Sequence, residues 1–387
     1  MFGQNARLLL RLSLLTVLLA ACGPGPSSET QDISAALTQA VQTVLAGLAT
    51  PTFTETPVPT ATAVRTPPAL PSSFTTTSLN PLDIPHIYVQ DACQYLRDKW
   101  DPNHSAPGTI AFVIMLHGIT KNPADVAPNG ISQQDFKKMM QGLKELGFEA
   151  IRTTQLADFL EHNAKIPSRS VLLIQDDRHM GENFNDHFRT YWEQWGWPVV
   201  NAWISFEDGP RALSLVDNIA LEMEGWVDHQ SHGYIHNINM SDSSTDEFIR
   251  GEFEGSINDL QQNFNKTPIA IIWPGGGFGV RPAQFAREYG YRLGFTINPR
   301  GPLMYNWIPL ADEADPQRPY FQSEGYVNDP LMTLPRYWPY QVLPNLDLIR
   351  VLGEEAAAYA EQNKAIELEY YDIVCAPTYG AIPTLTP

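Results

Sequence analysis

Residues 171–180 read VLLIQDDRHM, and this short stretch is the starting point for predicting the fold of the chain. An apolar run with the length of a buried strand ends abruptly in two adjacent carboxylates, Asp176 and Asp177. Like charges at neighbouring positions repel each other, and burial makes that repulsion more costly. Such a pair at the end of a core strand indicates a site that the two acids share.

Similar apolar runs recur along the chain and alternate with helix-like stretches. The strand-like runs are residues 109–116, 170–174, 199–206, 225–230, 268–273 and 292–297. The helix-like stretches are residues 134–147, 209–224, 244–264 and 281–290. Strands that alternate with helices predict a parallel sheet with helical cover. Because these units follow one another without a Pro/Gly linker, we expect an α/β fold, a deformed (β/α) barrel of about seven strands.

The first residues indicate export. Arg7 and Arg11 precede an apolar stretch that is too short to span a bilayer but has the length of a signal-peptide core. It ends in LAAC at residues 19–22, which resembles the lipobox of bacterial lipoproteins. We expect residues 1–21 to be a lipoprotein signal peptide, and acylated Cys22 to anchor the chain on the extracytoplasmic face of a bacterial membrane. An ordinary signal peptide with a chance cysteine is the alternative.

Residues 22–79 have a composition unlike that of a folded domain. Residues 32–49 place apolar side chains at helical spacing, but one short amphipathic helix is marginal by itself. Residues 50–77 are rich in Pro and Thr, which favours extended, solvated chain. We therefore expect a lipidated, disordered Pro/Thr-rich stalk, followed by a folded domain at residues 80–378 and a tail at residues 379–387.

Charge and cysteine content narrow the partners and the compartment. The chain has 387 residues, 43% of them hydrophobic, and a formal net charge of −18. That charge argues against nucleic acid as a partner and against direct adsorption to an anionic membrane surface. Of the three cysteines, Cys93 and Cys375 lie near the two ends of the predicted domain. Since exported proteins sit where disulfides persist, we favour a bridge between them, with two buried free thiols as the alternative.

Two histidines follow the apolar run at residues 225–230. His232 and His236 are four residues apart, so both imidazoles point to one side on a helical turn. Two imidazoles and one carboxylate form a common ligand set for a catalytic zinc ion. Since the carboxyl ends of barrel strands meet at one mouth, we expect these histidines to lie beside Asp176 and Asp177. One aspartate then binds the cation, while the other stays off it and accepts a proton from the attacking water.

The order and spacing of these motifs resemble those of a known family. Residues 136–177, 227–236 (VDHQSHGYIH), 268–279 (PIAIIWPGGGFG) and 286–301 are similar to successive motifs of the NodB-homology polysaccharide deacetylases, carbohydrate esterase family 4. The similarity covers roughly residues 110–340. It implies the deformed barrel and a metal-dependent hydrolase, namely a carbohydrate deacetylase that acts on C–N bonds other than peptide bonds.

The resemblance also implies a role for each matching position. It makes Asp176 the general base and gives the metal three ligands, Asp177, His232 and His236. Trp273 and Pro274 would lie along the substrate groove. The implied cofactor is one divalent metal ion, with Zn²⁺ favoured and Co²⁺, Ni²⁺ and Mn²⁺ suited to the same donors. The implied substrate is an acetylated cell-wall or extracellular polysaccharide that loses its N-acetyl or O-acetyl groups.

The chain departs from the family pattern in two ways that matter for catalysis. Ala270 stands where an arginine often orients the base, and no histidine follows His236, so the late histidine that serves as general acid in many members is missing. His179, His229 and His117 are candidates to replace it; alternatively, water protonates the leaving amine. An ester needs that acid less than an amide does, because an alkoxide leaves more readily than an amide anion.

Two further residues are candidates for substrate contact. His117 follows the first strand-like run and could line the site. It would also suit the oxyanion loop of an α/β-hydrolase, but the Gly-x-Ser-x-Gly elbow of that class is absent from the sequence. Arg336 could hold the base or a substrate oxygen, or could form an ordinary salt bridge.

Two functions from different classes stay open at this point. The first is a membrane-tethered, extracytoplasmic, metal-dependent deacetylase. The second is a non-catalytic glycan-binding surface lipoprotein on the same fold. The missing histidine and arginine favour the second function. The intact aspartate pair favours the first, because a pure binder has no need of a spare carboxylate beside a cation.

Overall fold

The computed structural model describes most of the chain after the predicted stalk. The described residues are 42, 65–206, 210–236, 238–316 and 322–384. The predicted signal peptide, Cys22 and most of the predicted stalk lie outside these residues. Among the described residues, no helix combines the length and the apolar character that a membrane span requires.

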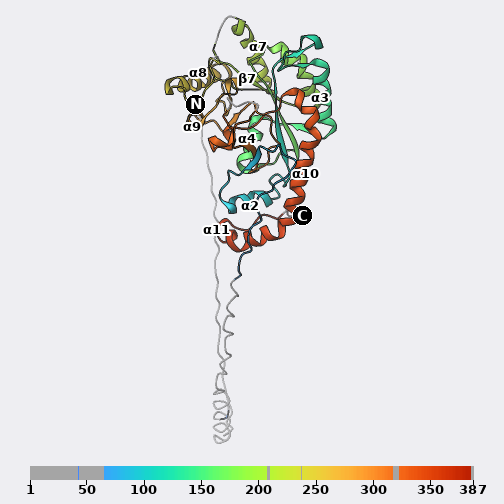
Figure 1. Cartoon of the computed structure of the whole chain (residues 1–387), viewed down its shortest axis with the longest axis vertical. Coiled ribbons are helices and arrows are strands. Elements are labelled where there is room, and N and C mark those ends of the chain that lie inside the picture. The colour runs from blue at the N-terminus through green and yellow to red at the C-terminus, as the bar shows by residue number, and fades with distance from the viewer. Residues whose placement is uncertain (1–41, 43–64, 207–209, 237, 317–321, 385–387) are drawn as a thin grey trace, which may run out of the picture. The chain divides into compact units, whose positions relative to one another are not determined.

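One parallel sheet of seven strands forms the centre of the domain (Figure 1). Its strands are β2 (Ile110–Leu116), β5 (Glu149–Ala150), β6 (Arg169–Gln175), β7 (Val199–Trp203), β8 (Val227–Ser231), β9 (Ala270–Ile272) and β10 (Leu293–Phe295). The order across the sheet is β10-β9-β8-β7-β6-β2, and β5 pairs with the first half of β6. The apolar runs of the sequence therefore form one parallel sheet, as predicted.

The sheet curls until its two edge strands meet at one short segment. Leu334 bridges to Phe295 of β10, and Tyr337 bridges to Ile114 of β2, both in parallel orientation. Backbone hydrogen bonds of 2.8 and 3.0 Å join Tyr337 to β2. Residues 334–337 thus close the sheet into a deformed barrel, which confirms the predicted fold class.

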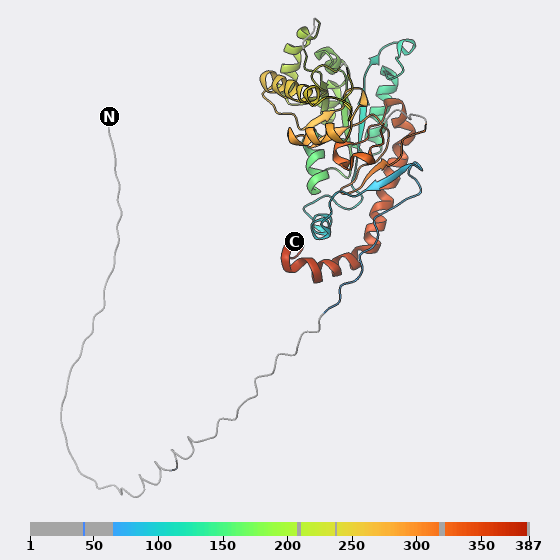
Figure 2. The same ribbon diagram turned by 60° about the vertical axis from the view of Figure 1, so that its left-hand side comes forward.

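Helices cover the outside of the barrel (Figures 1 and 2). They are α2 (Ala92–Trp100), α3 (Gln133–Glu145), α4 (Thr153–His162), α5 (Gly181–His187), α6 (Arg189–Trp195), α7 (Pro210–Glu224), α8 (Asp246–Phe264), α9 (Val280–Glu288), α10 (Pro339–Tyr370) and α11 (Ala376–Tyr379). Short 3₁₀ turns are η1 (Pro123–Asp125), η2 (Pro274–Gly276), η3 (Gly325–Val327) and η4 (Pro330–Met332). The four predicted helices correspond to α3, α7, α8 and α9. Thr245 shows why α8 begins where it does, since its hydroxyl accepts the backbone amide of Phe248 at 3.2 Å.

Strand β2 shows how the core is built on both faces of the sheet. All seven of its residues are buried. Because side chains alternate along a strand, Phe112 and Ile114 pack outward in the cluster formed with α3 and α10. Ala111 and Val113 point the other way and fill the barrel interior. The interior is therefore a packed core, and the chemistry has to lie at its mouth.

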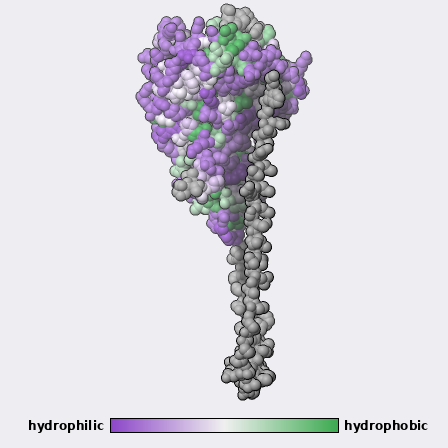
Figure 3. All heavy atoms as spheres, turned by 180° about the vertical axis from the view of Figure 1, so that it is seen from behind, coloured by the Kyte–Doolittle hydropathy of each residue, from purple (hydrophilic) through white to green (hydrophobic). Residues whose placement is uncertain are grey.

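Smaller elements cover the ends of the barrel. β1 (Asp83–His86) pairs antiparallel with β11 (Ile308–Ala311), and β3 (Ile119–Thr120) pairs with β4 (Ile131–Ser132). The compact unit begins at Arg65, earlier than the predicted boundary at residue 80. The reason is that this segment packs on the domain: Trp307 donates its indole N–H to the Phe74 carbonyl at 2.9 Å. The surface seen in Figure 3 is mostly hydrophilic, with apolar side chains in small patches.

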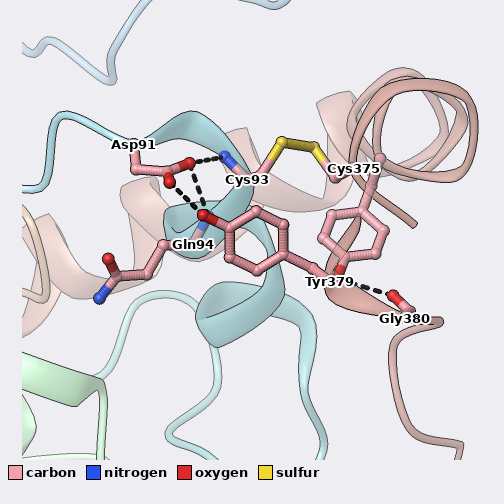
Figure 4. The surroundings of a disulfide bond; sticks show 7 residues. Asp91, Cys93, Gln94, Cys375, Tyr379 and Gly380 are labelled. Carbon is pink, nitrogen blue, oxygen red and sulfur yellow. Dashed lines mark hydrogen bonds between the residues drawn. A yellow bond between two sulfur atoms is a disulfide. The ribbon is translucent and has the colours of Figure 1, made fainter. Parts of the chain in front are cut away.

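A disulfide joins the first and last helical segments of the domain (Figure 4). Cys93 lies in α2, and Cys375 ends a π-helical turn (Tyr371–Cys375) that continues α10. The Asp91 carboxylate caps α2 by accepting the Cys93 amide at 2.8 Å, and the Tyr379 hydroxyl donates to the same carboxylate. The structure thus makes the pairing that the sequence favoured.

Candidate metal centre

Loops from two strand ends bring three ligand-type residues together at the mouth of the barrel. Asp177 follows β6, while His232 and His236 follow β8. The Asp177 Oδ1 atom lies 3.5 Å from His232 Nε2 and 3.7 Å from His236 Nε2. The three donor atoms all lie within 4.8 Å of one another. These are the three residues that the sequence analysis named as ligands.

The spacing and the donor types fit one divalent cation. Ligand atoms about 2.0–2.1 Å from a tetrahedral zinc ion lie about 3.4 Å apart, close to the distances seen here. His232 donates its Nδ1–H to the Ile272 carbonyl at 2.7 Å, so Nε2 is the ring nitrogen that faces Asp177 and is the one that would bind a metal ion. The Asp177 side chain is 44% exposed. Its partial burial by itself would raise its pKa, but the contact with His232, together with His117 and His236, holds that pKa well below its usual value. An ionised carboxylate and two neutral imidazole nitrogens form a donor set of the zinc type.

The turn that carries Asp177 is held in a conformation that residues with a side chain seldom adopt. Asp177 has φ 67° and the following Arg178 has φ 47°, both in the left-handed region. Arg178 is buried, donates from its guanidinium to the Ile204 carbonyl at 2.5 Å, and lies 4.7 Å over the Trp203 ring. Arg178 therefore anchors the turn, a role typical of supports around a functional site.

A buried acid that the sequence analysis missed holds the turn carrying both histidines. Glu252 of α8 accepts the backbone amides of Tyr234 at 2.7 Å and Ile235 at 3.1 Å. Gly233 has φ 77°, and a Cβ there would lie 2.6 Å from the Glu252 carboxylate. Glycine at this position therefore lets the carboxylate approach the backbone. The only sequence signal was an acid on an otherwise apolar helix face.

Asp176 takes no part in the ligand cluster and has a different partner. It is 2% exposed, and its Oδ1 accepts a hydrogen bond of 2.6 Å from the guanidinium of Arg336, which is 0% exposed. Burial alone would raise the pKa of Asp176, but Arg336, with two nearby histidines, lowers it below the usual value. Arg336 lies in the segment that closes the barrel and also donates to the Thr296 carbonyl at 2.7 Å. It thus puts a guanidinium on Asp176, where Ala270 supplies none.

Of the three histidines considered as replacements for the missing general acid, His117 lies within 4 Å of both aspartates. Its Nε2 lies 3.7 Å from Asp176 Oδ2 and 3.9 Å from Asp177 Oδ2. His229 is buried on the outer side of β8, where Glu222 and Phe264 surround its ring. His179 is the third of these histidines, and burial lowers its pKa.

Trp273 and Pro274 do not line an open groove, in contrast to the expectation drawn from the resemblance. Trp273 is 0% exposed and donates its indole N–H to the Met332 carbonyl at 2.8 Å. Pro274 is buried in η2. The physical reason is that Trp273 packs in a buried apolar cluster with Phe253 of α8 and Met332. The aromatic residue that stacks on His117 is instead Trp338, with ring centroids 5.4 Å apart.

No protein-family model matches the chain, and no curated protein matches it. Among solved structures, it is similar to the Streptococcus pyogenes deacetylase PplD in complex with acetate, with 18% identity and a TM-score of 0.48 over 62% of this chain and 98% of that one. It is also similar to a de-N-acetylase from Aggregatibacter actinomycetemcomitans, with 16% identity and a TM-score of 0.46 over 59% and 94% of the two chains. A third is IcaB from Ammonifex degensii, with 15% identity and a TM-score of 0.43 over 61% and 96%. At these identities and TM-scores the likeness carries no argument, and any activity has to rest on the residues of the site.

Proposed function

We propose that the chain is a metal-dependent deacetylase that hydrolyses N-acetyl or O-acetyl groups of a polysaccharide. The observation that carries this proposal is the division of the aspartate pair. Asp177 faces two histidines at 3.5 and 3.7 Å, whereas Asp176 is buried against Arg336 at 2.6 Å. A site that only binds a sugar through a cation needs no second ionised carboxylate beside it.

The chain's own residues divide the work of hydrolysis. When bound by Asp177, His232 and His236, the divalent ion supplies a positive charge that polarises the acetyl carbonyl and acidifies a nearby water. Asp176 is ionised and accepts the proton of the attacking water. Arg336 acts through Asp176, as a positioning residue that keeps the carboxylate charged and fixed.

His117 is placed to complete the reaction. The water oxygen forms a bond to the acetyl carbon, the C–N bond breaks, and the leaving nitrogen needs a proton to depart as an amine. His117 Nε2, 3.7 Å from the Asp176 carboxylate, lies where it can supply that proton. Its stacking on Trp338, with 15° between the ring planes, fixes the orientation of the imidazole. The products are acetate and a free amino sugar.

We further propose that the domain works on the extracytoplasmic side of a bacterial membrane, tethered by a lipid on Cys22. The apolar stretch and the LAAC motif at residues 19–22 support this proposal. The disulfide between Cys93 and Cys375 also supports it, because such bridges persist in oxidising compartments. Cell-wall or extracellular polysaccharide is the substrate that such a location offers.

The second function considered, a non-catalytic glycan-binding lipoprotein, rested on two missing residues. The Arg336 guanidinium donates to the proposed base, Asp176, and takes the place of the arginine that is missing at position 270. His117 stands near both aspartates in place of the late histidine. These two contacts weaken the two observations that favoured the binding function, and they support the deacetylase.

The proposal is tested by acetate release from N-acetylglucosamine oligomers and from an acetyl ester of a sugar. We expect release by the wild type, its loss with a chelator, and a decrease of about 10²- to 10⁴-fold in Asp176→Asn with metal content unchanged. Asp347→Asn removes an exposed acid on α10 and serves as the matched control. Tight glycan binding without acetate release from any acetylated sugar would refute the proposed deacetylase activity and favour the non-catalytic glycan-binding function.

A further inference from the structure

A buried glutamine that the chemistry above does not use lies between the strand ends that carry His117 and Asp176. Gln175 is the last residue of β6, directly before Asp176, and it is 0% exposed. Its partner across the sheet is Leu116, the last residue of β2, which His117 follows. A buried carboxamide is costly unless it is hydrogen-bonded, so the partners of Gln175 indicate what it does there.

The Gln175 carboxamide donates to the strand end that carries His117. Its Nε2 donates to the Leu116 carbonyl at 2.9 Å and also to the His117 carbonyl. The Asp176 backbone amide donates to the same Leu116 carbonyl at 2.7 Å. Because a carbonyl can only accept, the nitrogen of the carboxamide, and not its oxygen, has to face β2. The side chain thus continues the bonding between β6 and β2 beyond their last residue pair, and it ties His117 to the strand that carries Asp176.

The His117 ring has few other restraints. Trp338 stacks on one face, with ring centroids 5.4 Å apart. Nε2 faces the aspartates, 3.7 Å from Asp176 Oδ2. Nδ1 is buried and has no hydrogen-bond partner among the described residues, although a hydrogen bond at the second nitrogen is what commonly orients a functional imidazole. The place of His117 therefore depends on the stack with Trp338 and on the backbone that Gln175 holds.

We propose that Gln175 is a positioning residue for His117 and thereby sets the preference of the site between acetyl amides and acetyl esters. The C–N bond of an amide breaks only when the leaving nitrogen receives a proton, whereas the oxygen of an ester departs more readily without one. Displacement of His117 therefore slows amide hydrolysis more than ester hydrolysis. This inference rests on the proposed function, because Gln175 acts through the proton that His117 supplies.

The test compares acetate release from N-acetylglucosamine oligomers with release from an acetyl ester of a sugar. The full-length chain, with zinc added, is assayed as wild type and as Gln175→Met, which fills similar space without a hydrogen-bond donor. A displacement of a reacting group by about 1 Å can cost about 10²-fold in rate. We expect Gln175→Met to lower kcat for the amide by about 10- to 100-fold, and kcat for the ester by less than about threefold.

A second buried glutamine provides the matched control. Gln230 of β8 is 1% exposed and joins two strands, because its Oε1 accepts the backbone amides of Ile269 and Ala270 at 2.9 and 3.0 Å. Gln230→Met removes a comparable buried carboxamide away from His117, so it should leave the ratio of amide to ester rates unchanged. Gln175→Asn, one carbon shorter, is used if Gln175→Met unfolds at the assay temperature, and the same selective loss is expected of it.

A double-mutant cycle separates positioning from a structural effect. In a His117→Ala background, Gln175→Met should cause no further loss of amide hydrolysis, because the residue through which Gln175 acts is already gone. A structural defect would instead lower the rate by the same factor whatever side chain stands at position 117.

The outcomes separate this inference from the proposed function. No acetate release by the wild type from either substrate overturns both. Release by the wild type, with an equal loss for amide and ester in Gln175→Met, overturns the positioning role and leaves the deacetylase standing. An equal further loss in the His117→Ala background, or wild-type release from the ester alone, also overturns the positioning role. If the wild type hydrolyses the amide alone, the cycle decides.

Discussion

Replacement of Arg336 by methionine tests how the proposed base is kept ionised. In the wild type, the Arg336 guanidinium donates to Asp176 Oδ1 at 2.6 Å, and both side chains are almost fully buried. Methionine fills much of the same space without a charge. The substitution therefore leaves the buried Asp176 carboxylate without its guanidinium partner. The pKa of Asp176 then rises, because burial favours the protonated form.

The size of the effect follows from the geometry. Two unit charges about 4 Å apart interact by about 4 kcal/mol at an effective dielectric constant of about 20, which corresponds to about 3 pKa units. His232 and His117 also lower the pKa of Asp176 and are unchanged in this variant. We therefore expect the pKa of Asp176 to rise by about 2–3 units in Arg336→Met.

The assay is the pH dependence of kcat/KM for acetate release. In the wild type the pKa of Asp176 is lowered, so the carboxylate stays charged through the usual aspartate range and activity falls only at still lower pH. In Arg336→Met the acid limb of the profile should move to higher pH by about 2 units. Arg336→Lys retains the charge, though not the planar fork, and should shift the limb less. An unpaired buried carboxylate also costs about 3–5 kcal/mol of stability, so thermal unfolding of each variant is measured first.

A reduced rate with an unmoved acid limb in Arg336→Met would refute this reasoning. It would mean that Arg336 only closes the barrel and that Asp176 does not depend on it for its charge. A shift of equal size in Arg336→Lys would equally contradict the electrostatic explanation, because lysine keeps the positive charge.

Two further predictions concern stability. Glu222 is mostly buried, which by itself would raise its pKa, but its hydrogen bond with His229 at 2.8 Å and the charge of Lys266 lower that pKa to about 2. The stabilising effect of the ionised Glu222 carboxylate is present above the pKa of the unfolded state and is lost as pH falls toward 2. Glu222→Gln should therefore lower the free energy of unfolding, measured in urea, by about 3 kcal/mol at pH 7 and by far less near pH 2. An equal loss at both pH values would contradict this prediction. The disulfide between Cys93 and Cys375 spans 282 residues, and its replacement by two serines should cost about 2–5 kcal/mol, measured by thermal unfolding; a variant as stable as the wild type would contradict this.

The strands and the ligands could be predicted because their signals are local. β2 is an uninterrupted apolar run, and β6 contains one at residues 171–174. The four-residue spacing of His232 and His236 is readable without a structure. Their meeting with Asp177 follows from one rule, that the carboxyl ends of parallel strands share one edge. These features need no knowledge of distant contacts.

The closing segment could not be predicted, because it has no strand pattern of its own. Residues 334–337 include Pro335, which lacks a backbone N–H, and the segment pairs only through isolated bridges to β2 and β10. The place of Arg336 beside Asp176 depends on that long-range closure. Sequence reasoning therefore left its role open between holding the base, binding substrate and forming an ordinary salt bridge.

The burial of Trp273 and the stacking of Trp338 on His117 could not be predicted for a related reason. Trp273 follows an apolar run, and its sequence context resembles a groove motif, but β9 is only three residues long and the turn after it packs inward. Trp338 and Tyr340 stand at the start of a long helix, with no motif to mark them. The stacking of Trp338 on His117 exists only once the barrel has closed.

The most direct test of the central claim is metal content and affinity of the full-length chain and three variants. We expect close to one zinc ion per chain in the wild type, loss of that ion in Asp177→Asn and His232→Ala, and its retention in Asp176→Asn. Absence of bound metal in the wild type, or loss of metal in Asp176→Asn with retention in Asp177→Asn, would contradict the division of the two aspartates on which the proposed function depends.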